Sequence, residues 1–162
     1  QDQVKKLPKW VVLINRKIFL KKALKFKCSK KIFIDRSGSR FNHCQIFNQK
    51  PINKWAKKND LIIYKPEKLP FKKQIHLFKN ASIILGAHGA AFTNIIFCKP
   101  GTKVIEIIPA NHPNRKCERI CKILKLKYFR IVTKSDNSNK NFPFRIHLEK
   151  KHLEIIKKAI NL

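Results

Sequence analysis

Short apolar runs alternate along this chain with longer stretches in which apolar residues recur at helical spacing. The short runs are rich in β-branched and aromatic residues, as in strands that are buried on both faces of a sheet. They predict strands at 31–35, 61–64, 82–85, 103–108 and 128–132, and the run at 10–14 is a candidate sixth strand. The remaining pattern predicts helices at 16–26, 42–58, 71–80, 90–97, 114–124 and 148–160, and an Asn/Ser loop at 135–141.

Strands that alternate with helices predict an α/β fold, a Rossmann-like parallel sheet of five to six strands with helices on both faces. The 162 residues are expected to form one domain, 1–162. Ligands of such sheets bind beyond the carboxyl ends of the strands. Those ends lead into loops at 35–40, 64–69, 86–90, 106–111 and from 133 onward, and two of these loops hold three of the four glycines: Gly38, Gly86 and Gly89.

The most informative segment, 82–94, reads Ser-Ile-Ile-Leu-Gly-Ala-His-Gly-Ala-Ala-Phe-Thr-Asn. It predicts a buried strand, a tight glycine turn that ends at Ala90, and a helix whose first backbone N–H groups can hold a phosphate. His88 can add a hydrogen bond and, when protonated, a positive charge. The alternative is that its ring bonds a neighbouring carbonyl. Thr93, in the first turns of the helix, either binds phosphate or stabilises the helix start.

The loop 36–40, Arg-Ser-Gly-Ser-Arg, follows another predicted strand. Two arginines in one such loop, Arg36 and Arg40, can clamp a diphosphate with forked, charge-assisted hydrogen bonds. Ser37 adds a hydroxyl, and Asn42 is a candidate cap for the next helix. The alternative is a capped surface turn that holds no ligand.

Glu106 is a carboxylate inside an apolar strand, where it is costly unless it has a partner. One hypothesis is that it accepts hydrogen bonds from ribose hydroxyls, as acidic residues at strand ends do in nucleotide-binding folds. The alternative is a structural ion pair with one of the many lysines.

The net charge is +29, from 38 lysines and arginines against 9 aspartates and glutamates. A basic field attracts nucleotide diphosphates, anionic lipid and nucleic acid; the alternative is a solvated lysine surface with no particular partner. One hypothesis is therefore a non-catalytic module that binds nucleic acid or an anionic membrane. A membrane-surface role for the basic segment 16–27 is also compatible with an enzyme. The start at Gln1 and the absence of methionine favour a piece of a longer protein.

Five cysteines without a Cys-x-x-Cys pair favour a reducing compartment. Cys117 and Cys121, one helical turn apart with His112 nearby, suggest either a metal site or, more simply, small buried helix residues. The phosphate-binding loop of NTPases, the dinucleotide fingerprint and the hydrolase elbow are missing. An Asp-x-Asp pair that would hold a metal–diphosphate complex is missing too, so arginine, histidine and helix dipoles are expected to neutralise a bound diphosphate.

The order of these motifs resembles glycosyltransferase family 61. The resemblance runs from about 32 to 128 and rests on Arg-Ser-x-x-Arg-x-Asn (36–42), Gly-Ala-His-Gly-Ala-Ala-Phe-Thr-Asn (86–94), Pro-Gly (100–101) and Val-Ile-Glu (104–106). In one place the chain departs from the family, which commonly has Asn-Glu after the arginines. Here His43 follows Asn42.

The resemblance implies a two-domain GT-B architecture in which this chain is the C-terminal half, which binds the nucleotide sugar, while the N-terminal acceptor domain is missing. It implies an inverting transfer, usually from a UDP-sugar, to a hydroxyl of a glycan or protein, with no cofactor and no essential metal. Arg36 and Arg40 fall on the family's basic loop, His88 and Thr93 on its glycine turn, and Glu106 on its acidic strand position. The compartment stays open: cytoplasmic or membrane-peripheral in a bacterium, the ER or Golgi lumen in a eukaryote.

Overall fold

The structure, a computed structural model, describes residues 7–38, 44–110, 112, 115–136 and 144–162. Its α-helices are α1 (Lys9–Leu20), α2 (Gln49–Lys58), α3 (Phe71–Asn80), α4 (Lys116–Leu124) and α5 (Lys150–Asn161), and its 3₁₀ helices are η1 (Pro66–Lys68) and η2 (Ala90–Phe97). Its strands are β1 (Lys31–Ile34), β2 (Ile62–Tyr64), β3 (Ile83–Ala87), β4 (Lys103–Pro109), β5 (Lys127–Thr133), β6 (Ser135–Asp136) and β7 (Arg145–Ile146).

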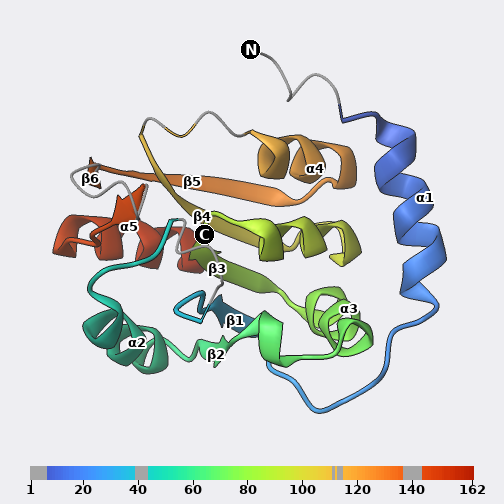
Figure 1. Ribbon diagram of the computed structural model, residues 1–162, viewed down its shortest axis with the longest axis horizontal. Coiled ribbons are helices and arrows are strands. Elements are labelled where there is room, and N and C mark those ends of the chain that lie inside the picture. Colours follow the sequence, from blue (N-terminus) through green and yellow to red (C-terminus); the bar gives the residue numbers. More distant parts are fainter. Residues whose placement is uncertain (1–6, 39–43, 111, 113–114, 137–143) are drawn as a thin grey trace.

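Within the described residues, five parallel strands form one sheet in the order β2-β1-β3-β4-β5 (Figure 1). Strand β1 pairs with both β2 and β3, so the chain builds the sheet outward in two directions from β1. The carboxyl ends of β1 and β3 are therefore the switch point of a doubly wound sheet, where such folds bind their ligands. The predicted α/β, Rossmann-like parallel sheet with helices around it is confirmed.

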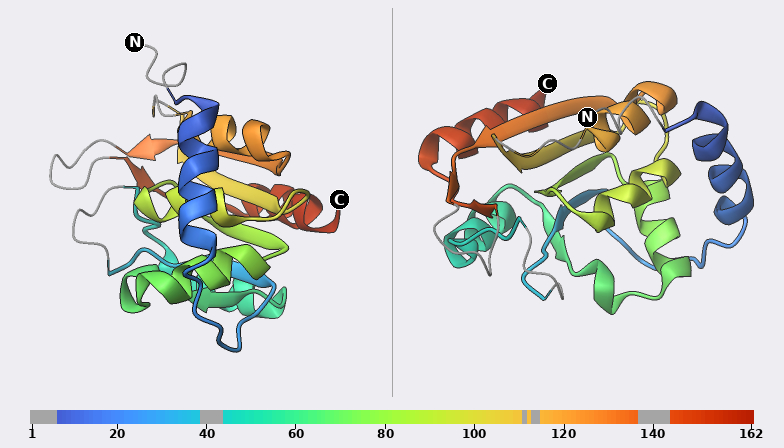
Figure 2. Two further views of the ribbon diagram at one scale, coloured as in Figure 1. Left: turned by 90° about the vertical axis from the view of Figure 1, so that its right-hand side faces the viewer. Right: turned by 45° about the horizontal axis from the view of Figure 1, so that its top comes forward.

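The two faces of the sheet pack against different helices because alternate strand residues point to opposite faces. Ile32 and Ile34 lie in a core shared with α1, α3, η2 and α4, whereas Phe33 lies in a second core shared with α2 and α5. In Figure 1, α1, α3 and α4 lie to the right and α2 and α5 to the left. The left view of Figure 2 shows α1 on the outside of the first group, running across the strands.

The N-terminal segment differs from its prediction. The apolar run at 10–14 is part of helix α1, not a sixth strand, and α1 ends at Leu20 rather than continuing to 26. Its buried residue Val12 belongs to the first core, and Phe19 and Leu20 pack against that core. The Arg16 guanidinium fixes the helix further, because it donates to the carbonyls of Ile96 and Cys98, each at 2.6 Å.

Two other predictions are revised. Helix α2 begins at Gln49 rather than near 42, with Pro51 in its first turn, where proline is tolerated. Ile46, inside the predicted helix, instead forms an isolated bridge with Ile146. The predicted loop at 135–141 begins with strand β6, which pairs with β7 in an antiparallel ribbon, and the rest of that loop lies outside the described residues.

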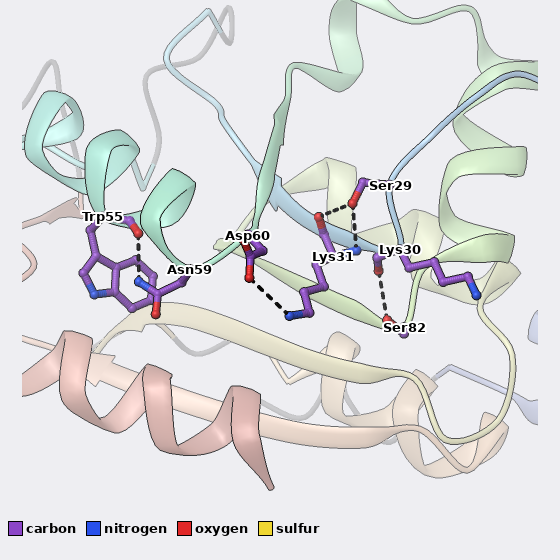
Figure 3. A network of polar contacts seen from close by, with 7 residues as sticks. All are labelled: Ser29, Lys30, Lys31, Trp55, Asn59, Asp60 and Ser82. Carbon is purple, nitrogen blue, oxygen red and sulfur yellow. Dashed lines mark hydrogen bonds and ion pairs between the residues drawn. The ribbon is translucent and has the colours of Figure 1, made fainter.

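Polar contacts fix the amino ends of the central strands (Figure 3). The Ser29 hydroxyl donates to the carbonyl of Lys31 at 3.0 Å and accepts its N–H at 3.1 Å. The Ser82 hydroxyl donates to the carbonyl of Lys30 at 3.2 Å, which ties the start of β3 to that of β1. The Lys31 ammonium lies 3.9 Å from the carboxylate of Asp60. These contacts hold the edge of the sheet opposite the strand ends that carry the candidate site.

Candidate functional site

The glycine turn continues strand β3 before the chain bends away. The His88 N–H donates to the carbonyl of Ile107 at 2.8 Å, so His88 still lies beside β4. Gly86 sits inside β3, where an added Cβ would lie 2.9 Å from the Cβ of Ile34 and 3.2 Å from the ring of Phe92. Close packing of neighbouring strand and helix, rather than an unusual backbone angle, therefore requires glycine at this position.

Arg36 lies against the same turn. Its Nη1 donates to the carbonyl of His88, and a Cβ added to Gly89 would overlap the guanidinium. The absence of a side chain at Gly89 therefore lets the arginine lie on the turn. Burial lowers the pKa of Arg36, but a guanidinium stays protonated at neutral pH. The structure thus brings together the first arginine of the predicted basic loop and the predicted glycine turn.

Beneath the turn, His88 and Glu106 form a buried pair. Nδ1 of His88 lies 2.5 Å from Oε1 of Glu106, and the hydroxyl of Tyr128 donates to Oε2 at 2.5 Å. The thiol of Cys117 is a third hydrogen-bonding partner of this carboxylate. Glu106 is only 1% exposed. The partner of the buried carboxylate is thus a histidine, not one of the lysines considered as the alternative.

These contacts decide the protonation of the network. Burial acts to raise the pKa of Glu106, but the hydrogen bonds from its three neighbours outweigh burial and hold the pKa below its ordinary value. Burial and the charge of Glu106 raise the pKa of Tyr128 and of Cys117 well above their ordinary values, so both keep their protons and donate them. Because Glu106 accepts only, Nδ1 of His88 carries a proton, and Nε2 is the atom left for other chemistry.

His112 covers the other side of His88. The two imidazole rings have centroids 4.3 Å apart, and the ring of Phe144 lies 5.0 Å from that of His112 in an edge-to-face contact. From the sequence, His112 was notable only as a neighbour of two cysteines, whereas the structure packs it against His88 of the candidate site. Its position in the loop after β4, at the carboxyl edge, was the one signal that could have indicated this.

The serine of the basic loop is held from two sides. The Ser37 N–H donates to Oδ1 of Asp35 at 2.8 Å, and the Lys65 ammonium donates to the Ser37 hydroxyl at 2.8 Å. The same ammonium lies 3.7 Å from the carboxylate of Asp35. Lys65 follows β2, so a third strand end contributes a positive charge at this edge of the sheet. Nothing in the sequence distinguishes Lys65 from the many other lysines of the chain.

The predicted helix after the turn is the 3₁₀ helix η2. Its first hydrogen bond joins the Phe92 N–H to the carbonyl of Gly89 at 2.9 Å. The fully buried residues Phe92, Ile95 and Cys98 recur at every third position, which is the period of a 3₁₀ helix. Ala90 and Thr93 are exposed on it.

A side-chain bond ties η2 to the neighbouring helix. The Asn94 amide donates to the side chain of Gln74 at 2.8 Å, and Gln74 in turn donates to the carbonyls of Pro66 and Leu69. Asn94 thus has a structural partner on α3. The predicted site residue Arg40 lies outside the described residues, as do Ser39, Asn42 and His43.

The cysteines of α4 are buried helix residues, as the simpler interpretation expected. Burial raises the pKa of Cys121 to about 12, so its thiol is protonated at neutral pH. Among the described residues, ligand atoms of His88, Glu106 and Cys117 lie within 4.8 Å of one another, close enough to hold a metal ion. The hydrogen bonds described above already account for this proximity.

The doubly wound parallel sheet makes this an α/β protein, and its arginine and glycine turn lie at the switch point, the place where sheets of this kind bind ligands. The model of the family described as Glycosyltransferase 61 matches residues 2–105, well over half of the chain. The chain belongs to this family, as the resemblance of its motifs indicated. Glu106 follows the last matched residue directly, and Tyr128 lies further along the chain, also outside the match.

Curated relatives match shorter parts. The chain is 37% identical over 60 residues to Beta-1,2-xylosyltransferase of Arabidopsis thaliana, which is 37% of this chain and 11% of that protein. It is 34% identical over 88 residues to Xylan glycosyltransferase MUCI21 of Arabidopsis thaliana, covering 52% of this chain and 17% of that protein. It is 46% identical over 37 residues to Beta-1,2-xylosyltransferase RCN11 of Oryza sativa subsp. japonica, covering 23% and 7%. The chain thus spans less than a fifth of each relative.

Proposed function

We propose that this chain binds the diphosphate of a nucleotide sugar at the carboxyl ends of β1 and β3, as the donor-binding half of an inverting GT-B glycosyltransferase. The observation that carries the proposal is the contact of the Arg36 guanidinium with the carbonyl of His88 over Gly89. It places a fixed positive charge on a glycine turn at the switch point of the sheet. Membership of the glycosyltransferase 61 family supports a sugar nucleotide as the phosphate ligand.

In the proposed reaction the bond between the sugar and the nucleotide diphosphate breaks, and negative charge grows on the departing diphosphate. Arg36, together with Arg40, holds this charge by forked hydrogen bonds. The first backbone N–H groups of η2 add donors. His88 donates from its ring to the leaving oxygens, and the carboxylate of Glu106 stabilises the imidazolium that this requires.

Other predicted residues have supporting roles. The exposed hydroxyls of Ser37 and Thr93 add neutral donors at the rim of the diphosphate. Glu106 is proposed to hold the ribose through Oε2 after Tyr128 releases that oxygen, while Oε1 stays paired with His88. The base that deprotonates the acceptor hydroxyl is proposed to come from the N-terminal half of the full-length enzyme.

The names of the relatives guide the choice of the donor to test. Two are called beta-1,2-xylosyltransferases and the third a xylan glycosyltransferase. UDP-xylose is therefore the first donor to test, and a glycan hydroxyl is the proposed acceptor.

Calorimetry with UDP and UDP-xylose tests the proposal as a binding reaction, which needs no acceptor half. The variants Arg36→Lys and Arg40→Lys keep the positive charge but lose the planar guanidinium that can bind a phosphate through two hydrogen bonds. We therefore expect each variant to weaken UDP binding by about tenfold. His88→Ala is expected to weaken it similarly. Lys125→Ala, a charge change on the C-cap of α4, is the matched control and keeps full affinity. Equal UDP affinity in all four variants and the wild type overturns the proposal.

A further inference from the structure

The outward face of helix α1 is apolar. Trp10 is 66% exposed, Leu13 42%, and Ile14 and Ile18 are each 47% exposed. Their spacing of three or four residues places them along one side of the helix, and we call these four residues the α1 stripe. A helix on the surface of a globular protein ordinarily turns charged residues to solvent on this side. Helix α1 instead exposes apolar side chains there.

The α1 stripe is part of the surface and not a loosely packed part of the core. The opposite side of the helix is the one that packs: Val12 is 2% exposed, and Phe19 contacts the ring of Phe71 at 5.5 Å between centroids. The Arg16 guanidinium holds α1 against the end of η2 through two carbonyls. Helix α1 can therefore meet a partner without leaving the protein, and Figure 2 shows it on the outside of the molecule.

The chain around the α1 stripe carries positive charge and no negative charge. Between Asp2 and Asp35 the sequence contains eleven lysines and arginines and no acidic residue. Lys17 and Lys21, which recur at the same helical spacing as the stripe, are both exposed. The partner of this face must therefore accept apolar side chains and offer negative charge at once.

An anionic lipid surface meets both requirements. Its headgroup region accepts tryptophan and branched aliphatic side chains, while lysines extend to the phosphates. Nucleic acid offers the charge but nothing for four exposed apolar side chains. Helix α1 has 12 residues, too few to cross a bilayer, whose core needs about 20. Within the described residues, no helix is both long and apolar enough to span a membrane.

We propose that helix α1 binds the surface of anionic membranes, with the α1 stripe between the headgroups and Lys17 and Lys21 beside it. The stripe and the candidate nucleotide site lie at different ends of η2, because Arg16 contacts its last residues whereas the glycine turn precedes its first. Membrane binding and nucleotide binding are therefore separable. This proposal stands independently of the proposed donor site.

Vesicle flotation tests the proposal. We expect the chain to float with phosphatidylcholine vesicles that contain 30% phosphatidylserine, and at least tenfold less with pure phosphatidylcholine. Ile14→Ser with Ile18→Ser is expected to lower binding by about tenfold, since each change removes apolar area from the interface. Ile155→Ser, on α5 and 51% exposed, is the matched control and keeps full binding. Circular dichroism checks that all variants are folded.

Fluorescence locates the contact on the helix. In a Trp55→Phe background, the one remaining tryptophan, Trp10, is expected to shift its emission to the blue on addition of anionic vesicles. Equal vesicle binding by the α1 and Ile155 variants overturns the proposal, as does an unshifted Trp10 emission. Two other results also overturn the proposal and assign the α1 stripe to another partner. One is binding to RNA without binding to vesicles. The other is concentration-dependent dimerisation that the α1 variant abolishes, again without binding to vesicles.

Discussion

Nδ1 of His88 lies 2.5 Å from Oε1 of Glu106, and this buried pair joins the glycine turn of β3 to the adjacent strand β4. The contact fixes the orientation of the imidazole and the nitrogen that carries its proton. A further hydrogen bond from Tyr128 fixes the carboxylate in turn. A histidine held in this way keeps its Nε2 in one orientation, so the ring is oriented in advance for contact with a ligand.

Loss of the Tyr128 hydroxyl tests the outer part of this network. Tyr128→Phe removes one hydrogen bond to a buried carboxylate, so we expect the free energy of unfolding to fall by about 1–3 kcal/mol. UDP affinity is expected to fall less than in His88→Ala, because the pair of His88 and Glu106 remains. Urea unfolding and calorimetry measure the two effects. An unchanged unfolding free energy contradicts the hydrogen bond.

The depressed pKa of Glu106 makes folding stability depend on pH. The stability that it contributes is fully present above the ordinary carboxyl pKa of about 4.3 and is lost as the pH falls through the lower folded value. We therefore expect the unfolding free energy of the wild type to fall more steeply than that of Glu106→Gln below about pH 4.5. Urea titrations from pH 6 to 3 measure this. If the unfolding free energies of the two proteins change with pH in parallel, the pKa of Glu106 is not lowered in the folded state.

Gly89→Ala places a methyl group where the Arg36 guanidinium lies. The arginine must move off the turn, so we expect UDP affinity to fall about tenfold with a small loss of stability. Gly101→Ala is the control: Gly101 has φ 83° and nothing within 4 Å of an added Cβ, so this variant loses about 1 kcal/mol of stability through strain and keeps UDP affinity. If Gly89→Ala binds UDP as tightly as the wild type, the position of Arg36 on the turn does not contribute to nucleotide binding.

Metal removal is expected to leave UDP binding unchanged, because arginine and histidine supply the positive charge in this account. The affinity for UDP in EDTA should equal that in Mg²⁺ or Mn²⁺. Addition of Zn²⁺ should not raise the unfolding temperature, since the thiol of Cys117 is protonated and hydrogen-bonded to Glu106. Loss of UDP affinity in EDTA, restored by one of these ions, assigns the neutralising role to a metal.

The apolar pattern predicted the central sheet well and the N-terminus badly. Runs such as 31–35 and 82–85 are flanked by turn residues and rich in the β-branched side chains of strands buried on both faces, so the sequence identifies them clearly as strands. Helix α3 was predicted with its observed bounds of 71–80. The run at 10–14 is short enough to suit either a strand or a helix, and only its packing against η2 and α3 decides for the helix.

The site could be predicted in part. Arg36 and the turn of Gly86 and Gly89 stand at strand ends that any parallel sheet brings to one edge. The pairing of His88 with Glu106 could not be predicted, because it depends on β3 and β4 being neighbours, with Gly86 opposite Glu106. Tyr128 comes from one strand further, and its role depends on the same unpredicted order.

A crystal structure of this chain with UDP bound tests the central claim most directly. The account predicts the diphosphate within hydrogen-bonding distance of the Arg36 guanidinium, the first backbone N–H groups of η2 and the ring of His88. A diphosphate bound elsewhere, with Arg36 still on the carbonyl of His88 and the turn unoccupied, contradicts it.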